Sequence, residues 1–278
     1  MKPLLIILSV LIALMIIVWL GLQINPKPFP SYTAPTNPLQ TIPIPNNLPA
    51  PVERYYRQLY GDSIPVFDSA VVSGTGRMNI AGIWLPARFR FTFTPGQEYR
   101  HYFENTIYGI PFFKVNEHFL GGTARLELPF GISEGAKIDQ GANLALWAEA
   151  IWMPSIWVTD PRVHWEAIDE NSATLVVPFK DSPDQSTAEM ERITAFFDPQ
   201  TGLLQSMQSM RYQGNESENK TLWINEAFEW QIQNEYWQPT QTAVTWADKG
   251  TPWARFTTLE VVYNSDVTQY IQQSGIEQ

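Results

Sequence analysis

A long series of segments in which apolar and polar residues alternate constrains the fold of this chain more than any other feature. In residues 87–94, Ala87 and three phenylalanines fall on one face, while two arginines and two threonines fall on the other. A period of two is typical of a β-strand with one buried face. Residues 123–130 repeat the pattern, and further strands are predicted at 66–78, 98–108, 111–119, 163–168, 173–179, 191–197, 203–212, 221–230, 243–246 and 254–263. Because short turns such as Thr94-Pro95-Gly96 separate the strands, antiparallel pairing is predicted.

One segment, residues 139–153, departs from this alternation and predicts a helix that ends before Pro154. Asp139 is the predicted N-cap. Both faces are apolar, one formed by Leu144, Trp147, Ala148 and Ile151 and the other by Ala145, Leu146, Trp152 and Met153. A helix that is apolar all round is buried on all sides, and this one is too short to span a membrane. We therefore expect it to lie against a curved sheet. A shorter amphipathic helix is predicted at 52–60, ended by Gly61.

The N-terminal run of residues 4–22 is apolar except for one serine and one glycine. Its nineteen residues at about 1.5 Å each give roughly 28 Å, the thickness of the hydrocarbon core of a bilayer. A cleaved signal peptide has a shorter apolar region that ends at small residues spaced like A-x-A, which the exit after Leu20 lacks. An uncleaved signal anchor at 1–23 is therefore predicted. Lys2 before the run, against Lys27 after it, favours an inside N-terminus and an outside domain.

A proline-rich segment follows the anchor. Nine prolines fall between Ile24 and Pro51, with almost no charge and no helical period. Such a composition favours an extended polyproline II conformation or disorder, and in either case a stalk at 24–51 that is no part of the core. No comparable break interrupts the strands after it, so one domain is predicted at 52–263, followed by a polar tail at 264–278.

Charge and composition exclude several classes of function. The net charge of −10 argues against nucleic-acid binding, which needs clustered Lys and Arg, and against docking on anionic lipid through a basic patch. The absence of cysteine removes disulfides, thiolate catalysis and cysteine-ligated metals. It also leans toward a bacterial cell envelope. No cofactor is predicted, and because none of the three histidines (His101, His118, His164) has a metal-ligand spacing, no metal site is predicted either.

Several short stretches carry a resemblance to known proteins. They include Trp84-Leu85-Pro86, Gly121-Gly122, the helix exit Trp147-Ala148-Glu149-Ala150-Ile151-Trp152-Met153-Pro154, Val163-His164-Trp165-Glu166, Val244-Thr245-Trp246 and Trp253-Ala254-Arg255-Phe256. The chain resembles an uncharacterised bacterial family of membrane-anchored domains, similar in turn to the LolA and LolB superfamily of lipoprotein carriers. The resemblance implies a mainly β (α+β) fold, a long curved antiparallel half-barrel around a buried apolar helix. It implies no chemistry.

Two motifs are weighed as catalytic or cofactor signals and set aside. Gly131-Ile132-Ser133-Glu134-Gly135 matches the G-x-S-x-G nucleophile elbow, but the elbow needs a parallel sheet and a helix directly after the serine. Residues 135–140 are expected to form a loop among antiparallel strands. Gly74-Thr75-Gly76 is half of a dinucleotide fingerprint and is better explained as a bulge in a strand.

Glu149 is the residue that resists a structural explanation, because a carboxylate on an all-apolar helix is costly unless it is paired or protonated. It forms either a buried ion pair, with Arg100 or Arg125 as candidate partners, or a polar contact to a ligand, or it marks an opening where the helix reaches the surface. The candidate ligand-binding residues are Glu149, Leu146, Trp152, Met153, Phe113 and His118. No catalytic residue is assigned.

The preferred hypothesis is a non-catalytic binding domain for a hydrophobic or amphiphilic ligand, such as a lipid or an acylated molecule, in a groove between helix and sheet. It is held at the bacterial inner membrane by a single span, with the domain on the extracytoplasmic side. A structural or assembly module that binds an envelope protein partner is the alternative. An acid/base enzyme centred on Glu149 is a third. An extended apolar tunnel favours the first hypothesis, whereas a filled core with an exposed flat aromatic patch favours the second.

Overall fold

The computed structural model describes residues 2–180, 189–233 and 235–274. The helices are α1 (Lys2–Gly21), α2 (Ala50–Tyr60), α3 (Ala136–Ala148), the 3₁₀ turn η1 (Ala150–Trp152), α4 (Ile156–Thr159) and α5 (Thr268–Ile271). The strands are β1 (Gln40–Pro43), β2 (Ser63–Val66), β3 (Ala70–Ile80), β4 (Ile83–Thr94), β5 (Glu98–Ile107), β6 (Ile110–Leu120), β7 (Thr123–Leu128), β8 (Gly131–Ser133), β9 (His164–Ala167), β10 (Ser172–Lys180), β11 (Glu189–Phe197), β12 (Leu204–Arg211), β13 (Thr221–Gln233), β14 (Tyr236–Trp246) and β15 (Pro252–Tyr263).

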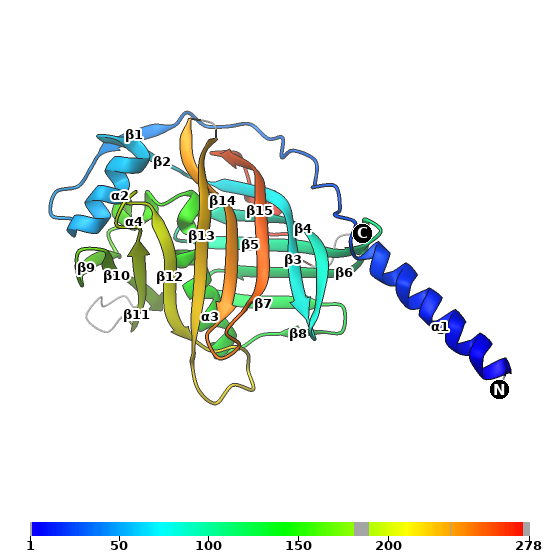
Figure 1. The fold of residues 1–278 in the computed structure, drawn as a ribbon. Coiled ribbons are helices and arrows are strands. Elements are labelled where there is room, and N and C mark those ends of the chain that lie inside the picture. Colours follow the sequence, from blue (N-terminus) through cyan, green and yellow to red (C-terminus); the bar gives the residue numbers. More distant parts are fainter. Residues whose placement is uncertain (1, 181–188, 234, 275–278) are drawn as a thin grey trace.

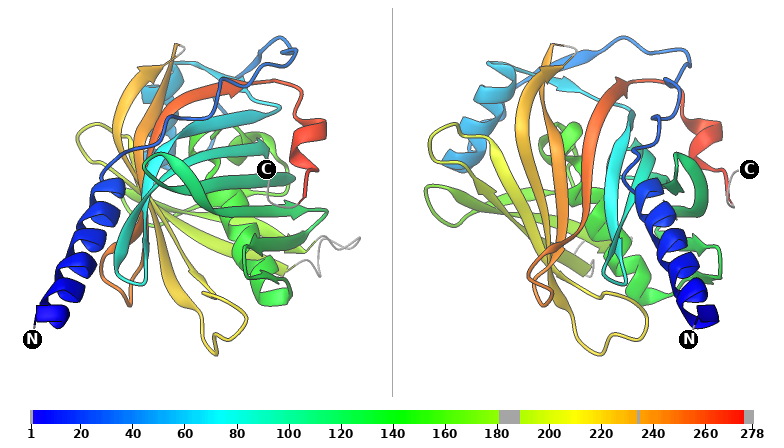
Figure 2. Two further views of the ribbon diagram at one scale, coloured as in Figure 1. Left: turned by 90° about the vertical axis from the view of Figure 1, so that its right-hand side faces the viewer. Right: turned by 45° about the vertical axis from the view of Figure 1, so that its right-hand side comes forward.

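Thirteen strands form one curved antiparallel sheet, as the alternation predicts (Figure 1). The order is β8-β7-β6-β5-β4-β3-β15-β14-β13-β12-β11-β10-β9, so two runs of hairpins meet where β3 pairs with β15. The edge strands β8 and β9 are not paired with each other in the described part of the chain. The segment that joins these two edges in sequence contains α3, η1 and α4, and the sheet curves around it (Figure 2). The predicted half-barrel around a helix is therefore confirmed.

Helix α3 is buried on all sides, as its two apolar faces require. Trp147 is 1% exposed and its neighbours from Gln140 to Ala148 are all buried. The helix begins at Ala136, one turn before the predicted N-cap, and Asp139 instead accepts a hydrogen bond from the backbone N–H of Ala124 on β7 (2.8 Å). Asp139 thus ties the helix to the sheet, and the expected loop at 135–140 is the first turn of α3.

The other differences from the predicted elements have local causes. The strand expected at 66–78 is two strands, β2 and β3, because the chain bends at Asp68, whose backbone N–H donates to the Asn264 side chain (2.9 Å). Strand β14 is longer than predicted. It includes Pro239, which pairs with Trp230. Because proline has no N–H to donate to a neighbouring strand, a strand is not expected at this residue from the sequence.

The proline-rich segment does not stand away from the domain. Residues 24–37, which we name the strap, run along the outer face of the sheet in an extended conformation (Figure 2). Phe29 lies against Tyr102 (5.8 Å between ring centroids) and under the guanidinium of Arg88 (4.5 Å). Tyr32 donates a hydrogen bond to the Asp266 carbonyl (2.8 Å). The next residues form β1, which pairs with β2. The segment is predicted to be no part of the core. In the structure its aromatic residues cover polar groups of β4 and β5, and Ile42, Ile44 and Leu48 pack against the core.

Helix α1 is the one long apolar helix in the described residues. The stretch Pro3–Gly21 is long and apolar enough to cross a membrane, and only 6% of it is buried. Its last turn touches the β5–β6 turn, where the Tyr108 hydroxyl donates to the Ile17 carbonyl (2.6 Å) and the Tyr108 backbone N–H donates to the Gly21 carbonyl (2.9 Å).

Candidate functional site

A small cavity lies between α3 and the concave face of the sheet. Its volume is about 90 Å³. Its walls combine aromatic and aliphatic side chains with six polar ones. The lining residues are Met78, Phe91, His101, Phe103, Glu117, Ala145, Glu149, Trp152, Arg211, Trp223, Asn225, Thr242, Val244, Trp253 and Phe256.

Strand register brings the polar groups into this cavity. His101 on β5 lies opposite Phe91 on β4 and opposite Glu117 on β6, so the three side chains share the concave face. Arg211 is the last residue of β12. Glu149 is the C-cap of α3, at the bend where the α-helix changes to the η1 turn, and the bend aims its side chain at the sheet. Four titratable residues from distant parts of the sequence therefore meet at one point.

His101 is the centre of the group. Its Nε2 lies 3.3 Å from Glu149 Oε2, and its Nδ1 lies 4.0 Å from Glu117 Oε2. Tyr99 stacks on the imidazole (4.1 Å between centroids) and donates its hydroxyl proton to Glu117 Oε1 (2.7 Å). His101 is only 5% exposed. Phe91 also packs on the imidazole (4.4 Å between centroids), so two aromatic rings restrict the movement of the histidine.

Burial keeps both members of the closest pair neutral. Burial, with the nearby charge of Glu117, raises the pKa of Glu149 to about 8, against a smaller lowering by Arg211. Burial, with the charge of Arg211, lowers the pKa of His101 to about 3. At neutral pH the 3.3 Å contact is thus between a carboxylic acid and a neutral imidazole, not an ion pair.

Arg211 supplies a cation to the cavity. Its guanidinium stacks on Trp223 (4.8 Å) and Trp246 (5.5 Å). Gly141 of α3 leaves room for it, since a Cβ there would lie 2.7 Å from Arg211 Nη2. Among the described residues Arg211 forms no ion pair within 4 Å. The cation is held in place by aromatic rings rather than by a carboxylate.

Three polar atoms of the cavity-lining residues have no hydrogen-bond partner of good geometry in the described chain. They are His101 Nε2, Arg211 Nε and Trp253 Nε1, all shielded from solvent. A buried polar atom left unpaired costs about 1–3 kcal/mol, so such atoms mark a place where water or a ligand group belongs. No cluster of three metal-ligating side chains occurs within residues 2–180, 189–233 and 235–274.

The predicted ligand-binding residues separate into those that reach this cavity and those that do not. Glu149 and Trp152 line it. Leu146 lines a different hollow, which lies beside Phe119 at the β4–β5 and β6–β7 turns. Met153 is fully packed in the core, and Phe113 packs on Phe130 (5.8 Å) at a sheet end.

His118 and the two arginines proposed as partners of Glu149 lie on the wrong face of the sheet. His118 pairs with Arg100 and with Arg125 in the ladder, and all three point outward. Arg100 donates to Asn116 Oδ1 (2.6 Å), and Arg125 contacts Glu127 and Glu134. The predicted arginine pairing of Glu149 is therefore wrong, because Arg100 precedes His101 by one residue and a strand alternates its faces.

His101, Glu117 and Arg211 were not predicted as site residues. The alternation of apolar and polar residues indicates the first two, because both occupy positions on the apolar face of their strands. His101 shares its face with Tyr99 and Phe103, and Glu117 shares its face with Phe119. A titratable residue on the apolar face of a strand is the exception that a sequence search should look for. Arg211 ends a strand of polar and sulfur-containing residues, so its inward position depends on register alone.

The nucleophile-elbow motif has no catalytic context. Ser133 ends the edge strand β8, which pairs antiparallel with β7. A helix does begin at Ala136, but the parallel sheet that the elbow requires is absent among the described strands. His164 is on β9, at the other edge of the sheet, where it contacts Glu166 (3.5 Å).

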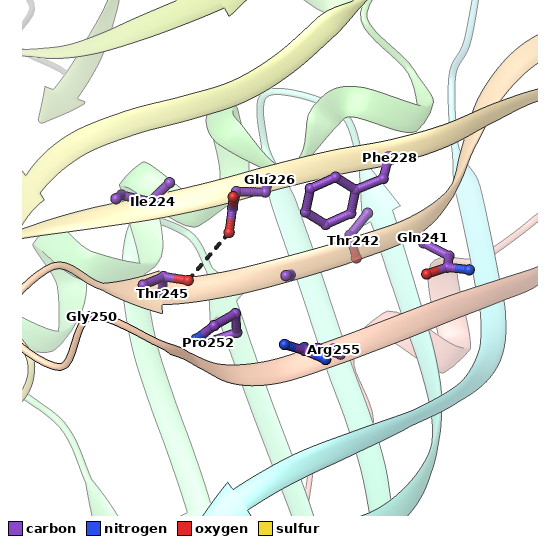
Figure 3. A pocket seen from close by; sticks show the side chains of 10 residues that line it. Ile224, Glu226, Phe228, Gln241, Thr242, Thr245, Gly250, Pro252 and Arg255 are labelled. Carbon is purple, nitrogen blue, oxygen red and sulfur yellow. Dashed lines mark hydrogen bonds between the residues drawn. The ribbon is translucent and has the colours of Figure 1, made fainter.

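A second hollow, open to solvent, lies on the outer face of β13, β14 and β15 (Figure 3). Its volume is about 460 Å³. Figure 3 shows Glu226 accepting a hydrogen bond from the Thr245 hydroxyl (3.3 Å), with Arg255 reaching in from the neighbouring strand. Its polar groups are partnered or exposed, so it is a weaker candidate than the inner cavity.

The fold and the cavity define a class of protein, a mostly β domain whose curved antiparallel sheet encloses one helix and a small polar-and-aromatic site. Within that class the chain belongs to a family of unknown function, DUF6544, which it matches over residues 40–256. The predicted membership in an uncharacterised family is confirmed. No curated protein matches the chain.

Solved structures with a similar chain path include members of the superfamily expected from the sequence. One is a LolA superfamily protein from Nitrosomonas europaea, with 10% identity and a TM-score of 0.47, over 82% of this chain and 98% of that one. A putative outer membrane lipoprotein-sorting protein domain from Vibrio parahaemolyticus has 10% identity and a TM-score of 0.41, over 79% and 92%. A DUF1329 family protein from Desulfovibrio piger has 11% identity and a TM-score of 0.39, over 74% and 92%.

Proposed function

We propose that this protein is a non-catalytic binding domain for an amphiphilic ligand and that α1 tethers it to a membrane. The observation that carries the proposal is the cavity between α3 and the sheet, where aromatic walls surround three buried polar atoms that no described residue satisfies. A mostly apolar site with a few convergent polar groups is the usual form of a small-molecule site.

The size of the cavity limits what enters it. At about 90 Å³ it is well below the roughly 300–1,000 Å³ of sites that enclose a whole ligand. We therefore assign the cavity to a polar head group that accepts hydrogen bonds from Arg211 and its neighbours. The apolar part of the ligand then leaves past the partly exposed Phe103 and Trp253.

The tether rests on the length and composition of α1. An anchor with its N-terminus inside and the domain on the extracytoplasmic side of a bacterial inner membrane agrees with the apolar stretch Pro3–Gly21 and with its exposure along nearly its whole length. A cleaved signal sequence has the same composition, and recovery of a mature chain that begins near Asn25 would refute the tether.

Two observations favour other functions. Trp147, Trp157 and Trp223 fill the core, and no extended apolar tunnel accompanies the small cavity in the described residues, which favours a structural or assembly module that binds a protein partner. The contact between the protonated Glu149 and the neutral His101 places a proton donor beside an acceptor, which favours an acid/base enzyme. The following experiment tests the binding proposal against these two alternatives together.

The full chain, purified in a mild detergent from a bacterial host, is examined by native mass spectrometry for a retained amphiphile. We expect wild type to retain one and Arg211→Met to lose most of it, because methionine keeps the packing on Trp223 and removes the cation. Arg255→Met is the matched control, since Arg255 also stacks on a tryptophan, Trp84 at 5.5 Å, but on the outer face. Equal retention by both variants, or an empty wild-type protein, contradicts the proposal.

A further inference from the structure

Three hairpin turns of the sheet are apolar and carry no charged residue. They are the β3–β4 turn (residues 79–84), the β5–β6 turn (107–113) and the β7–β8 turn (128–132). Together we name them the apolar tips. Their exposed side chains, with exposed fractions, are Ile80 (36%), Ile83 (55%), Tyr108 (43%), Ile110 (66%), Phe112 (53%), Phe130 (77%) and Ile132 (54%). Exposed large apolar residues are ordinary when scattered, but a contiguous group marks an interaction surface.

The antiparallel register places these three turns at one end of the sheet. Strands β3 to β8 are neighbours in the order in which they occur, so every second turn falls at the same end. Phe113 of the β5–β6 turn packs on Phe130 of the β7–β8 turn (5.8 Å between ring centroids), which shows that these two tips are in contact. The turns at the opposite end are different, since Thr94-Pro95-Gly96-Gln97 and Gly121-Gly122 expose no large apolar side chain.

Helix α1 leaves the domain at the apolar tips. In Figures 1 and 2 it departs from the side of the molecule where these turns lie. The contact is specific, because Tyr108 of the β5–β6 turn bonds to the Ile17 and Gly21 carbonyls. In addition, Arg77, close to the β3–β4 turn, donates to the Leu22 carbonyl (2.6 Å). The end of the apolar helix therefore lies directly against the β5–β6 tip.

We infer that the apolar tips rest in the surface layer of the lipid bilayer that α1 spans; this inference depends on the proposed tether. Apolar side chains with aromatic residues beside them are what a protein inserts at the boundary between head groups and acyl chains. Trp19 (59% exposed) and Tyr108 lie where interfacial aromatic residues occur in membrane proteins. The chain has a net charge of −10 and the tips have no charge, so the contact is apolar and independent of anionic lipid.

The inference is tested with single cysteines, since the native chain has none. Ile83→Cys and Ile110→Cys in the full chain are labelled with an environment-sensitive fluorophore and placed in zwitterionic vesicles with and without a nitroxide-bearing lipid. Ile168→Cys, at the β9–β10 turn, is the matched control, because Ile168 (52%) and Ile83 (55%) are equally exposed. We expect quenching at both tip positions to be roughly threefold stronger than at Ile168. A nitroxide on a lipid quenches only a fluorophore that lies in or close to the bilayer, and the inference places the tips, but not Ile168, in its surface layer.

The outcomes separate the inference from the tether. When Phe130→Glu and Phe112→Glu are added to the labelled Ile83→Cys chain, quenching by the nitroxide lipid should fall. The chain should still remain in the carbonate-washed membrane pellet, because α1 is unchanged. A chain that stays in that pellet and shows equal quenching at Ile83 and Ile168 overturns the inference and leaves the tether standing. Quenching between two labelled copies without quenching by lipid overturns it in favour of self-association. Release of wild type by carbonate refutes the tether and the inference with it.

Discussion

At the scale of single residues, Glu149 and His101 show how burial rather than pairing sets the state of a titratable group. Their pKa values of about 8 and about 3 are each displaced in the direction that favours the neutral form. The two displacements act on stability in opposite pH ranges. Because the folded pKa of Glu149 is raised from 4.5, its contribution is fully present below pH 4.5 and is lost as the pH rises through about 8. Because that of His101 is lowered from 6.5, its contribution is present above pH 6.5 and is lost as the pH falls through about 3.

Glu149→Gln should therefore become more stable relative to wild type as the pH rises. Glutamine has the shape of the protonated acid and cannot ionise, so the variant escapes the loss that wild type suffers between pH 5 and pH 8. We expect the difference in unfolding free energy to shift toward the variant by about 1–3 kcal/mol over that range. Urea unfolding at both pH values measures it. Glu166→Gln is the control, because the Arg192 hydrogen bond lowers the pKa of Glu166 and no such gain is expected. Parallel pH curves for Glu149→Gln and wild type would show that Glu149 is ionised in the fold.

At the scale of elements, the strap shows how a segment without secondary structure can stabilise a sheet. The outer face of β4, β5 and β6 carries buried polar groups, among them Arg100 (0% exposed) and Asn116 (0% exposed). The strap and α5 cover them, with Arg100 donating to the Gln273 side chain (3.1 Å) and Arg90 near both Tyr32 (5.7 Å) and Tyr270 (5.6 Å). The strap, predicted as part of a stalk, and α5, predicted as part of a polar tail, thus cover the polar cluster on the outer face of β4, β5 and β6.

Phe29→Ala should weaken the packing of the strap on the sheet. It removes a ring that lies under Arg88 and against Tyr102, with an expected loss of about 1–2 kcal/mol in unfolding free energy. Leu39→Ala serves as the control, since Leu39 is 37% exposed and is expected to change stability little. Limited proteolysis gives an independent readout, because residues 28–37 should be cut faster in Phe29→Ala than in wild type. Equal cutting rates would mean that the strap does not pack in solution.

At the scale of the whole molecule, the pairing of β3 with β15 joins the two runs of hairpins into one sheet. Gly74 and Gly76 allow it, because an added Cβ would lie 2.0 Å from the Thr257 carbonyl oxygen and 2.5 Å from that of Arg255. The ladder shifts register between Thr258, which pairs with Gly74, and Glu260. Gly74-Thr75-Gly76 itself pairs one to one with both neighbouring strands, so the bulge predicted there is wrong, and the extra residue of this ladder, Leu259, lies on β15.

Gly74→Ala should destabilise the entire domain rather than one hairpin. The new methyl group meets backbone, which cannot move without breaking the ladder, so we expect a loss of about 2 kcal/mol or more, with one cooperative transition. Gly131→Ala is the control, because nothing lies within 4 Å of a Cβ there, and its effect should stay within about 0.5 kcal/mol. Two separate unfolding transitions in Gly74→Ala would indicate that the hairpin runs fold independently.

The sequence by itself determined the strands and the two kinds of apolar helix, because each depends on a local pattern of apolar residues: alternation in the strands, an all-round apolar surface in α3 and an unbroken apolar run in α1. Twelve predicted strand segments all correspond to strands of the sheet. The sequence also singled out Glu149, as a carboxylate on a helix with no polar face. Its partners were decided only by the tertiary structure. His101, Glu117 and Arg211 meet Glu149 because of the register of strands distant in sequence, and a shift of one residue would turn each of them to the other face. The packing of the strap was likewise decided only by the tertiary structure, because it depends on polar groups that neighbouring strands place together on the outer face of the sheet.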